Sequence, residues 1–187
     1  KSISEVSKMI KTRFYLGKLK QWSYYKLNNY EIWVAGLNSE KSIKNIYDII
    51  NKTKVIDTKI CTKILKDLGD HFGIVILSKD WSFAAVDYSR GYPLYWKIKG
   101  NALNLSTQAN LLSAKEINKN QLAAFRMSGY TINDNTLWKK VKSLKAGSYL
   151  FFKNKNNFHC KKYFTFFPEE FKKNSYKKYM IELTYQI

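Results

Sequence analysis

The hydrophobic and polar positions in the first half of the chain follow the period of amphipathic helices. In residues 2–11, the apolar face consists of Ile3, Val6, Met9 and Ile10. After Ser39 a second face carries Ile43, Ile46, Tyr47 and Ile50, and after Asp57 a third carries Ile60, Cys61, Ile64, Leu65 and Leu68. Because this spacing places apolar side chains on one side of a helix, it predicts three helices.

Short apolar runs bounded by turn residues predict strands in much of the remaining sequence. They cover residues 30–35, 72–77, 82–87, 93–98, 102–106, 148–153 and 157–164. We expect an antiparallel meander from the four runs between residues 72 and 106. The turns at residues 89–92 and 99–101 contain Gly91 and Gly100, which can adopt the positive φ angles of tight turns. Two further helices are predicted, at residues 120–127 and 175–187.

Length and composition indicate a folded protein with one main domain. The chain has 187 residues, of which 45% are hydrophobic and 16% aromatic, too many for a disordered chain. The longest apolar run, residues 72–77, is far shorter than the roughly 20 residues that span a bilayer, so we expect no membrane partner. Since the first residues lack an initiator Met and the apolar core of a signal peptide, we interpret them as a fragment start and expect a cytoplasmic location.

The net charge of +19 suggests a polyanion-binding function as an alternative. Of the 33 basic residues, 30 are lysines and three are arginines, and no more than two lysines stand together. Arginine is the better reader of bases, and A/T-rich codons account for the many Lys, Asn, Ile, Tyr and Phe residues. We therefore expect a solvated lysine surface and no nucleic-acid partner. A lysine-rich module that binds nucleic acid or an anionic surface stays open as an alternative.

Two cysteines, Cys61 and Cys160, are too few for a disulfide framework. Cys61 belongs to a predicted helical apolar face, so we expect a buried core thiol. His159 and Cys160 are neighbours on a predicted strand, where adjacent side chains point to opposite faces and cannot converge on one ion. We expect no metal and no cofactor in this chain.

An ordered series of motifs between residues 57 and 165 resembles the asparagine synthetase family. Residues 86–96, VDYSRGYPLYW, are similar to the family segment RDxxGxxPLYY. Residues 68–77 occupy the place of a preceding family strand, and residues 103–112 resemble the segment that follows. Residues 120–150 continue the match through Gly129-Tyr130, Thr136-Leu137-Trp138 and Ala146-Gly147.

The resemblance implies the N-terminal domain of a class II glutamine amidotransferase, which has the N-terminal-nucleophile fold. This fold class is α+β, with two antiparallel sheets sandwiched between helices. Residues 1–165 would form the glutaminase-like domain, and residues 166–187 a linker and first helix leading to a synthetase domain absent from this sequence. In such families the synthetase domain uses ATP and Mg²⁺ to form the amide. The expected partner is this C-terminal synthetase domain of the same parent protein, and a homodimer is left open.

The residues that carry the chemistry of the family are replaced here. The family nucleophile is a Cys at the mature N-terminus whose own α-amine acts as base, whereas residue 1 is Lys and neither cysteine is near it. The family oxyanion hole uses an Asn-Gly pair, and the matching position reads Ala35-Gly36. Because alanine cannot donate a hydrogen bond from its side chain, we expect no catalytic residues.

Two residues match substrate-binding positions of the family and are interpreted as vestiges. Gly36 fits the turn beside the oxyanion hole, and Asp57 matches the aspartate that holds the amine of glutamine. Asp57 also stands at the N-cap position of a predicted helix, which explains it fully. His71 is interpreted as a hydrogen-bonding residue at a strand edge.

The preferred function is therefore a catalytically degenerate glutamine amidotransferase-like domain, a scaffold for the synthetase domain of an asparagine synthetase-related ligase. One alternative is an active glutaminase whose nucleophile lies outside this numbering. The other is the lysine-rich binding module described above.

Overall fold

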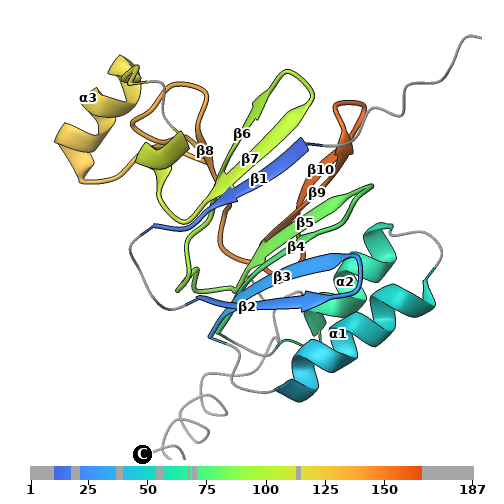
Figure 1. Cartoon of the computed structure of the whole chain (residues 1–187). Helices are drawn as coiled ribbons and strands as arrows, with labels where there is room; N and C mark the ends of the chain where they lie inside the picture. Colours follow the sequence, from blue (N-terminus) through green and yellow to red (C-terminus); the bar gives the residue numbers. More distant parts are fainter. Residues whose placement is uncertain are drawn as a thin grey trace, which may run out of the picture.

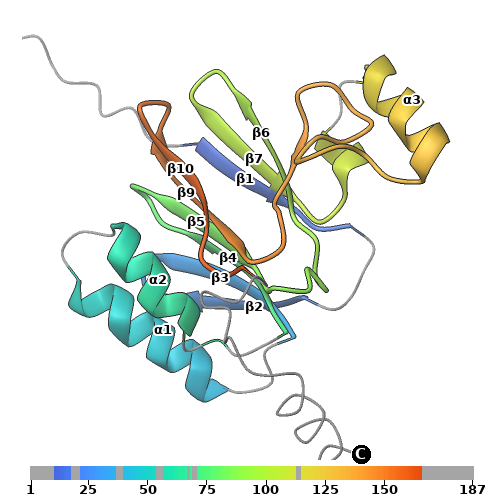
Figure 2. The ribbon, with the colours of Figure 1, turned by 180° about the vertical axis from the view of Figure 1, so that it is seen from behind.

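The computed structural model of the chain describes residues 11–17, 22–36, 40–53, 57–66, 68, 71–112 and 115–165. Within them, strands form two stacked sheets, and two helices cover the outer face of one sheet (Figure 1). The view from behind shows the same layers (Figure 2). The chain is therefore α+β with two sheets, which confirms the predicted fold class.

The larger sheet has six strands, all paired antiparallel with their neighbours. Its order is β10-β9-β5-β4-β3-β2. The strands are β2 (Trp22–Leu27), β3 (Tyr30–Ala35), β4 (Gly73–Leu77), β5 (Ser82–Val86), β9 (Ser148–Asn154) and β10 (Asn157–Lys162). All except β2 lie within or close to the predicted runs.

The smaller sheet is mixed, which corrects the expectation of two antiparallel sheets. It contains β1 (Lys11–Tyr15), β7 (Ala102–Ser106), β6 (Tyr95–Lys99) and β8 (Lys142–Ser143), in the order β1-β7-β6-β8. β1 pairs with β7 in parallel. Because β1 comes from a distant part of the sequence, no hairpin turn dictates its direction. The hydroxyl of Ser106 adds a 2.9 Å bond to the carbonyl oxygen of Tyr15.

Helices α1 (Glu40–Lys52) and α2 (Thr58–Lys66) bury the predicted apolar faces against the six-stranded sheet. The core between them and the sheet includes Ile43, Ile46, Ile50, Cys61, Ile64, Ile32, Ile74 and Ile76. Cys61 is fully buried there, as predicted. Burial of one apolar helical face drives this packing.

A second core lies between the two sheets. It contains Val75, Ala84, Val86, Leu94, Leu103, Leu105, Leu144, Leu150 and Phe152. On β4, Val75 belongs to this core, whereas Ile74 and Ile76 belong to the core under the helices. A strand buried on both faces reads as a continuous apolar run, which is why residues 72–77 show no alternation.

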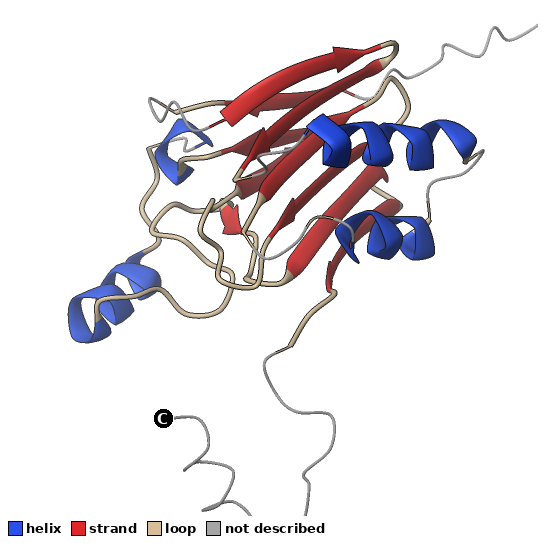
Figure 3. Cartoon of the chain, turned by 90° about the horizontal axis from the view of Figure 1, so that it is seen from below, coloured by secondary structure: helices blue, strands red, loops and turns tan. Residues whose placement is uncertain are grey.

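Helix α3 (Lys119–Ser128) stands apart from the sheets, beyond the short helix η1 (Ala109–Leu112) (Figure 3). Asn118 caps its start, and Gly129 ends it with a φ of +80°. The described residues thus show the helical layer on the six-stranded sheet alone. The predicted helix at residues 175–187, and the one at residues 2–11 apart from Lys11, lie outside the described residues. In the part of the chain that the structure describes, no helix has the length and apolar character needed to cross a membrane.

Candidate functional site

Three strand ends meet at one end of the six-stranded sheet. Since the neighbours are antiparallel, the end of β3 lies beside the start of β4, and that lies beside the end of β5. The register places Ala35 opposite Gly73, and Gly73 opposite Val86. The residues just outside these strand ends, with those of the next loop, form the candidate site. This Gly36 site consists of Gly36, His71, Asp87, Ser89 and Tyr92.

Gly36 follows β3 in a left-handed conformation, with a φ of +76°. A β-carbon at this position would overlap the carbonyl oxygen of His71 and the ring of Tyr92. Backbone conformation and crowding therefore both require glycine here. The predicted turn is present, and its α-carbon faces packed protein atoms.

Aromatic rings cover the backbone beside this turn. The rings of Trp22 and Tyr92 meet edge to face, with centroids 6.5 Å apart. A β-carbon on Gly73 would lie 2.8 Å from the indole of Trp22 and 2.8 Å from the β-carbon of Tyr92. The glycines at the end of β3 and the start of β4 thus let both rings approach the strands closely.

Ala35 stands where the resemblance implies an asparagine. It is 2% exposed, and its methyl side chain carries no polar atom. An oxyanion hole needs preorganised N–H donors aimed at the position where negative charge develops. The side chain before the Gly36 turn supplies none.

Asp87 is fully buried and accepts hydrogen bonds from the surrounding backbone. Its Oδ2 accepts the N–H of Phe72 at 3.1 Å and that of Gly91 at 3.3 Å. Its Oδ1 accepts the N–H and the hydroxyl of Ser89, each at 2.6 Å. A buried carboxyl is tolerated when its oxygens are satisfied in this way, so Asp87 acts as the organising residue of the 87–91 turn.

The 87–91 turn differs from the prediction in one respect. Arg90 adopts the positive φ, +57°, whereas Gly91 is not among the described residues with a positive φ. The N–H groups of Ser89 and Gly91 both point at the carboxyl of Asp87, and this arrangement fixes the intervening backbone. The guanidinium of Arg90 lies 5.5 Å from the ring centroid of Tyr95. Local side-chain bonding therefore decides which residue takes the left-handed conformation.

His71 lies just before β4, and its Nδ1 is 3.4 Å from the hydroxyl oxygen of Ser89. This confirms the interpretation of His71 as a hydrogen-bonding residue, but it stands at the end of an interior strand and not on an edge strand. The Ser89 hydroxyl donates its shorter bond to Asp87 instead, at 2.6 Å. A nucleophilic serine needs a base that receives its proton, so this order of groups does not form a Ser-His-Asp triad.

Tyr163 lies beside the site, because its hydroxyl donates a 2.9 Å bond to the carbonyl oxygen of Val86, the residue before Asp87. Burial raises the pKa of Tyr163 well above its usual value, and the nearby Asp87 carboxyl raises it further. The phenol therefore stays neutral through the physiological range and serves as a donor.

Asp57 caps helix α2, as one of the two sequence interpretations expects. Its Oδ1 accepts the N–H of Ile60 at 2.9 Å, and its carbonyl oxygen accepts the N–H of Cys61 at 3.0 Å. A carboxylate that binds the first N–H groups of a helix stabilises the helix end.

The structure does not bring Gly36 and Asp57 together. Figure 1 shows that β3 ends, and α2 begins, at opposite ends of the six-stranded sheet. The side chain of Asn28, in the β2–β3 turn far from Gly36, bonds to the hydroxyl of Tyr47 on α1. From there, α1 continues away from Gly36 before the chain reaches Asp57. The nine residues of α2 then return about 13 Å toward β4.

The two cysteines lie outside the Gly36 site. Burial raises the pKa of the Cys61 thiol to about 12, and the negative charge of Asp57 contributes to the rise. Cys160 lies on the edge strand β10, where partial removal of water raises its pKa, Asp134 adds to the effect and Lys145 opposes it. Because the thiolate is the nucleophile, neither cysteine is activated. Among the described residues, no three His, Cys, Asp or Glu side chains gather as a metal site.

Sequence reasoning missed the central roles of Asp87, Tyr92 and Tyr163. An aspartate followed by serine two residues later and glycine four residues later is a typical side-chain-bonded turn, so the role of Asp87 could have been found from the sequence. Tyr92 and Tyr163 carry no such signal, because their contacts depend on the pairing of distant strands.

Comparison with solved structures finds similar proteins, among them the following two. One is the allosteric regulatory enzyme of purine biosynthesis, at 13% identity and a TM-score of 0.44, over 76% of this chain and 31% of that one. The other is the B. subtilis glutamine phosphoribosylpyrophosphate amidotransferase in complex with ADP and GMP, at 13% identity and a TM-score of 0.42, over 75% of this chain and 30% of that one. The chain spans about a third of the length of these structures. No family model and no curated protein matches it.

Proposed function

We propose that the chain is a catalytically inactive glutamine amidotransferase-like domain and a scaffold for the synthetase domain of an asparagine synthetase-related ligase. The motif series between residues 57 and 165 motivates the family. One observation carries the loss of activity: the Gly36 turn is retained, but Ala35 precedes it and the ring of Tyr92 packs against it. The Gly36 turn therefore has its expected conformation but lacks the side-chain hydrogen-bond donor that an oxyanion hole needs.

The chemistry of the nearby nucleophiles supports this proposal. The Ser89 hydroxyl is engaged by Asp87, and burial keeps the Cys61 thiol protonated. Acyl transfer from glutamine requires an activated nucleophile next to an oxyanion hole, and the described side chains around Gly36 offer neither. In this proposal, ATP and Mg²⁺ act in the synthetase domain, and the parent ligase works in the cytoplasm.

Release of glutamate from glutamine by the purified chain is the direct test. We expect no release above the rate in buffer for the unmodified chain, and the same for Cys61→Ser, Cys160→Ser and Gly36→Ala. Release that Cys160→Ser or Gly36→Ala abolishes would overturn the proposal in favour of an active glutaminase. The Cys61→Ser variant is the matched control, because its thiol is buried under α1 and α2.

The scaffold role is tested in the parent ligase. We expect its ATP-dependent release of pyrophosphate to proceed without glutamine and to fall when this domain is removed. A requirement for glutamine, or full activity without the domain, would contradict the scaffold role.

A further inference from the structure

The two faces of the four-stranded sheet differ in character. On β7, Leu103 and Leu105 belong to the core between the sheets, and on β1 Phe14 packs against the same core. Since successive side chains of a strand point to opposite faces, Arg13 on β1 and Asn104 on β7 point outward. Helices α1 and α2 lie beyond the six-stranded sheet, so neither of them covers this outer face (Figure 1).

Strand pairing arranges the outward residues in rows that cross β1, β7 and β6. The rows are Tyr15–Ser106–Tyr95, Arg13–Asn104–Lys97 and Ala102–Lys99. Neighbouring strands lie about 4.8 Å apart, and the rows follow one another at about 6.6 Å along each strand. Arg13 and Lys99 are exposed, and Tyr15 is 37% exposed. We call Arg13, Tyr15, Lys97, Lys99 and Asn104 the outer-sheet surface.

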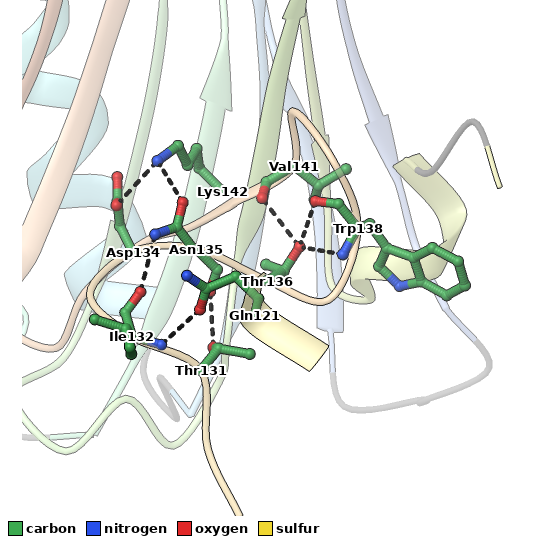
Figure 4. A network of polar contacts seen from close by, with 9 residues as sticks. All are labelled: Gln121, Thr131, Ile132, Asp134, Asn135, Thr136, Trp138, Val141 and Lys142. Atoms are coloured by element: carbon green, nitrogen blue, oxygen red, sulfur yellow. Dashed lines mark hydrogen bonds and ion pairs between the residues drawn. The ribbon is translucent and has the colours of Figure 1, made fainter. Parts of the chain in front are cut away.

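The outer-sheet surface carries cations without carboxylates. β1, β6 and β7 contain no Asp or Glu. Asp134, in the loop that leads to the adjoining β8, is already paired with Lys142 at 3.1 Å (Figure 4). Lys97 donates to the carbonyl oxygen of Leu112 at 3.4 Å, where η1 meets the sheet. In the part of the chain that the structure describes, no carboxylate forms an ion pair with a cation of this surface, so its positive potential attracts anions.

Two of the three arginines of the chain lie at this face of the sheet. Arg13 is one of them. The guanidinium of the other, Arg90, lies 5.5 Å from the ring centroid of Tyr95, which stands in an outward row. A/T-rich codons account for the many lysines, but they do not account for this placement of the arginines. Because a guanidinium binds phosphate through a planar fork and stacks on bases, the placement favours a nucleic-acid ligand.

The tyrosine and the amide of the surface favour a single strand over a duplex. Tyr15 is two positions from Arg13 on the same strand and face, so a base stacked on its ring keeps the phosphate near the guanidinium. The amide of Asn104, in the row of Arg13, offers donors and an acceptor to the edge of a base. Bases inside a duplex are stacked on one another, whereas those of a single strand are free to stack on a side chain.

We propose that the outer-sheet surface binds single-stranded nucleic acid. Tyr15 stacks on a base, Asn104 bonds to a base edge, and Arg13, Lys97 and Lys99 contact phosphates. Sheets that bind single strands combine aromatic stacking with a positively charged face in this way. The inference does not depend on the proposed scaffold function, because the Gly36 site lies at the end of the other sheet.

Fluorescence anisotropy with the full chain tests this proposal. The labelled probes are oligouridylate and oligothymidylate of about 12 nucleotides, which is within the site sizes of single-strand binders, and a duplex of the same length. Inorganic polyphosphate is the competitor that has charge but no bases. We expect each single strand to bind at least roughly fivefold more tightly than the duplex, and polyphosphate to compete poorly. The tighter of the two single strands shows whether RNA or DNA is preferred.

Substitutions locate the binding. Tyr15→Ser is expected to weaken binding of the preferred strand by roughly fivefold or more, the cost of a lost base stack. Tyr24→Ser is its control, because Tyr24 is 50% exposed on β2 in the other sheet. Arg13→Gln should lower the slope of log K against log salt by about 0.7, the contribution of one phosphate contact. Lys44→Gln is the charge-matched control, because Lys44 is exposed on α1, beyond the six-stranded sheet.

Several outcomes would overturn the proposal. They are no binding of either single strand, equal binding of the duplex, full competition by polyphosphate, and equal effects of the substitutions and their controls. Sedimentation with phosphatidylserine vesicles tests a different anionic ligand. Binding to the vesicles that Arg13→Gln weakens, without binding of the single strands, would identify a membrane surface as the ligand instead.

Discussion

Asp87 and Phe72 hold each other through two hydrogen bonds across the ends of paired strands. The N–H of Asp87 donates to the carbonyl oxygen of Phe72 at 3.0 Å, and the N–H of Phe72 donates to the side chain of Asp87 at 3.1 Å. The carbonyl oxygen of Asp87 also accepts the N–H of Gly147 at 2.8 Å. One residue thus joins β4, β5 and the turn before β9.

Asp87→Asn is expected to destabilise the protein by about 3 kcal/mol. An amide keeps one acceptor oxygen but turns an NH₂ group toward backbone N–H donors, which leaves buried polar groups unpaired. Urea unfolding measures the loss. Ser89→Ala removes one bond to the same carboxyl and should cost about 1 kcal/mol. If the two variants lose equal stability, Asp87 does not organise the turn.

Gly36→Ala is expected to destabilise the protein by more than Gly100→Ala. Both glycines have positive φ, so both substitutions incur a backbone cost of about 1 to 2 kcal/mol. A β-carbon at Gly36 also meets His71 and Tyr92, whereas one at Gly100 has nothing within 4 Å. The difference between their unfolding free energies isolates the crowding at the Gly36 site. A difference near zero would show that Tyr92 does not pack against Gly36.

The buried thiol of Cys61 predicts a loss of stability at alkaline pH. Its pKa is about 12 in the folded state and 9.0 ordinarily, so below pH 9 both states keep the proton and the contribution is fully present. Between pH 9 and about 12 the unfolded thiol loses its proton first, and stability falls by about 1.4 kcal/mol per pH unit.

Urea unfolding of the unmodified chain and of Cys61→Ala provides the measurement. It is done at about pH 8, 9 and 10, which run from below the range in which the thiol titrates into its lower part. The variant should lose less stability per pH unit than the unmodified chain. Parallel pH profiles would show that the thiol titrates normally.

Gln121→Met is expected to loosen the loop after α3 without affecting the core. Methionine keeps the length of the side chain but removes the acceptor of the Ile132 N–H, and a lost bond of this kind costs about 1 to 3 kcal/mol. Amide hydrogen exchange should rise in residues 130–136 and stay unchanged in β4. Ser128→Ala is the control, because its hydroxyl is exposed. Faster exchange in β4 would mean that the loop supports the core.

The sequence predicted the strands best where turns and burial agree. β3 and β7 match the predicted runs residue for residue, since a tight turn adjoins each and their inward residues are apolar. β1 was not predicted: the helix predicted over residues 2–11 included its first residue, Lys11, and the rest of the strand was assigned to no element because Phe14 is its one strongly apolar residue. Its parallel pairing with β7 is a tertiary event that no local pattern encodes.

The candidate site was predicted only in part. The Gly36 turn could be expected from the end of a strand, and the cap at Asp57 from the start of a helix. The distance between Gly36 and Asp57 could not be predicted, because it depends on the direction in which α1 and α2 cross the sheet. The contact of Tyr92 with Gly36 likewise needs two segments that are distant in the sequence.

The parallel pairing of β1 with β7 sets an order of events during synthesis. Tyr15 and Ser106 are 91 residues apart, so β1 leaves the ribosome on the order of 10 s before its partner exists. In the six-stranded sheet, β5 also waits for a distant partner, β9. Strands β2 to β5, however, follow one another along the chain with only α1 and α2 between them. We expect the helix-covered half to fold first and the nascent β1 to remain available to chaperones until residue 106 emerges.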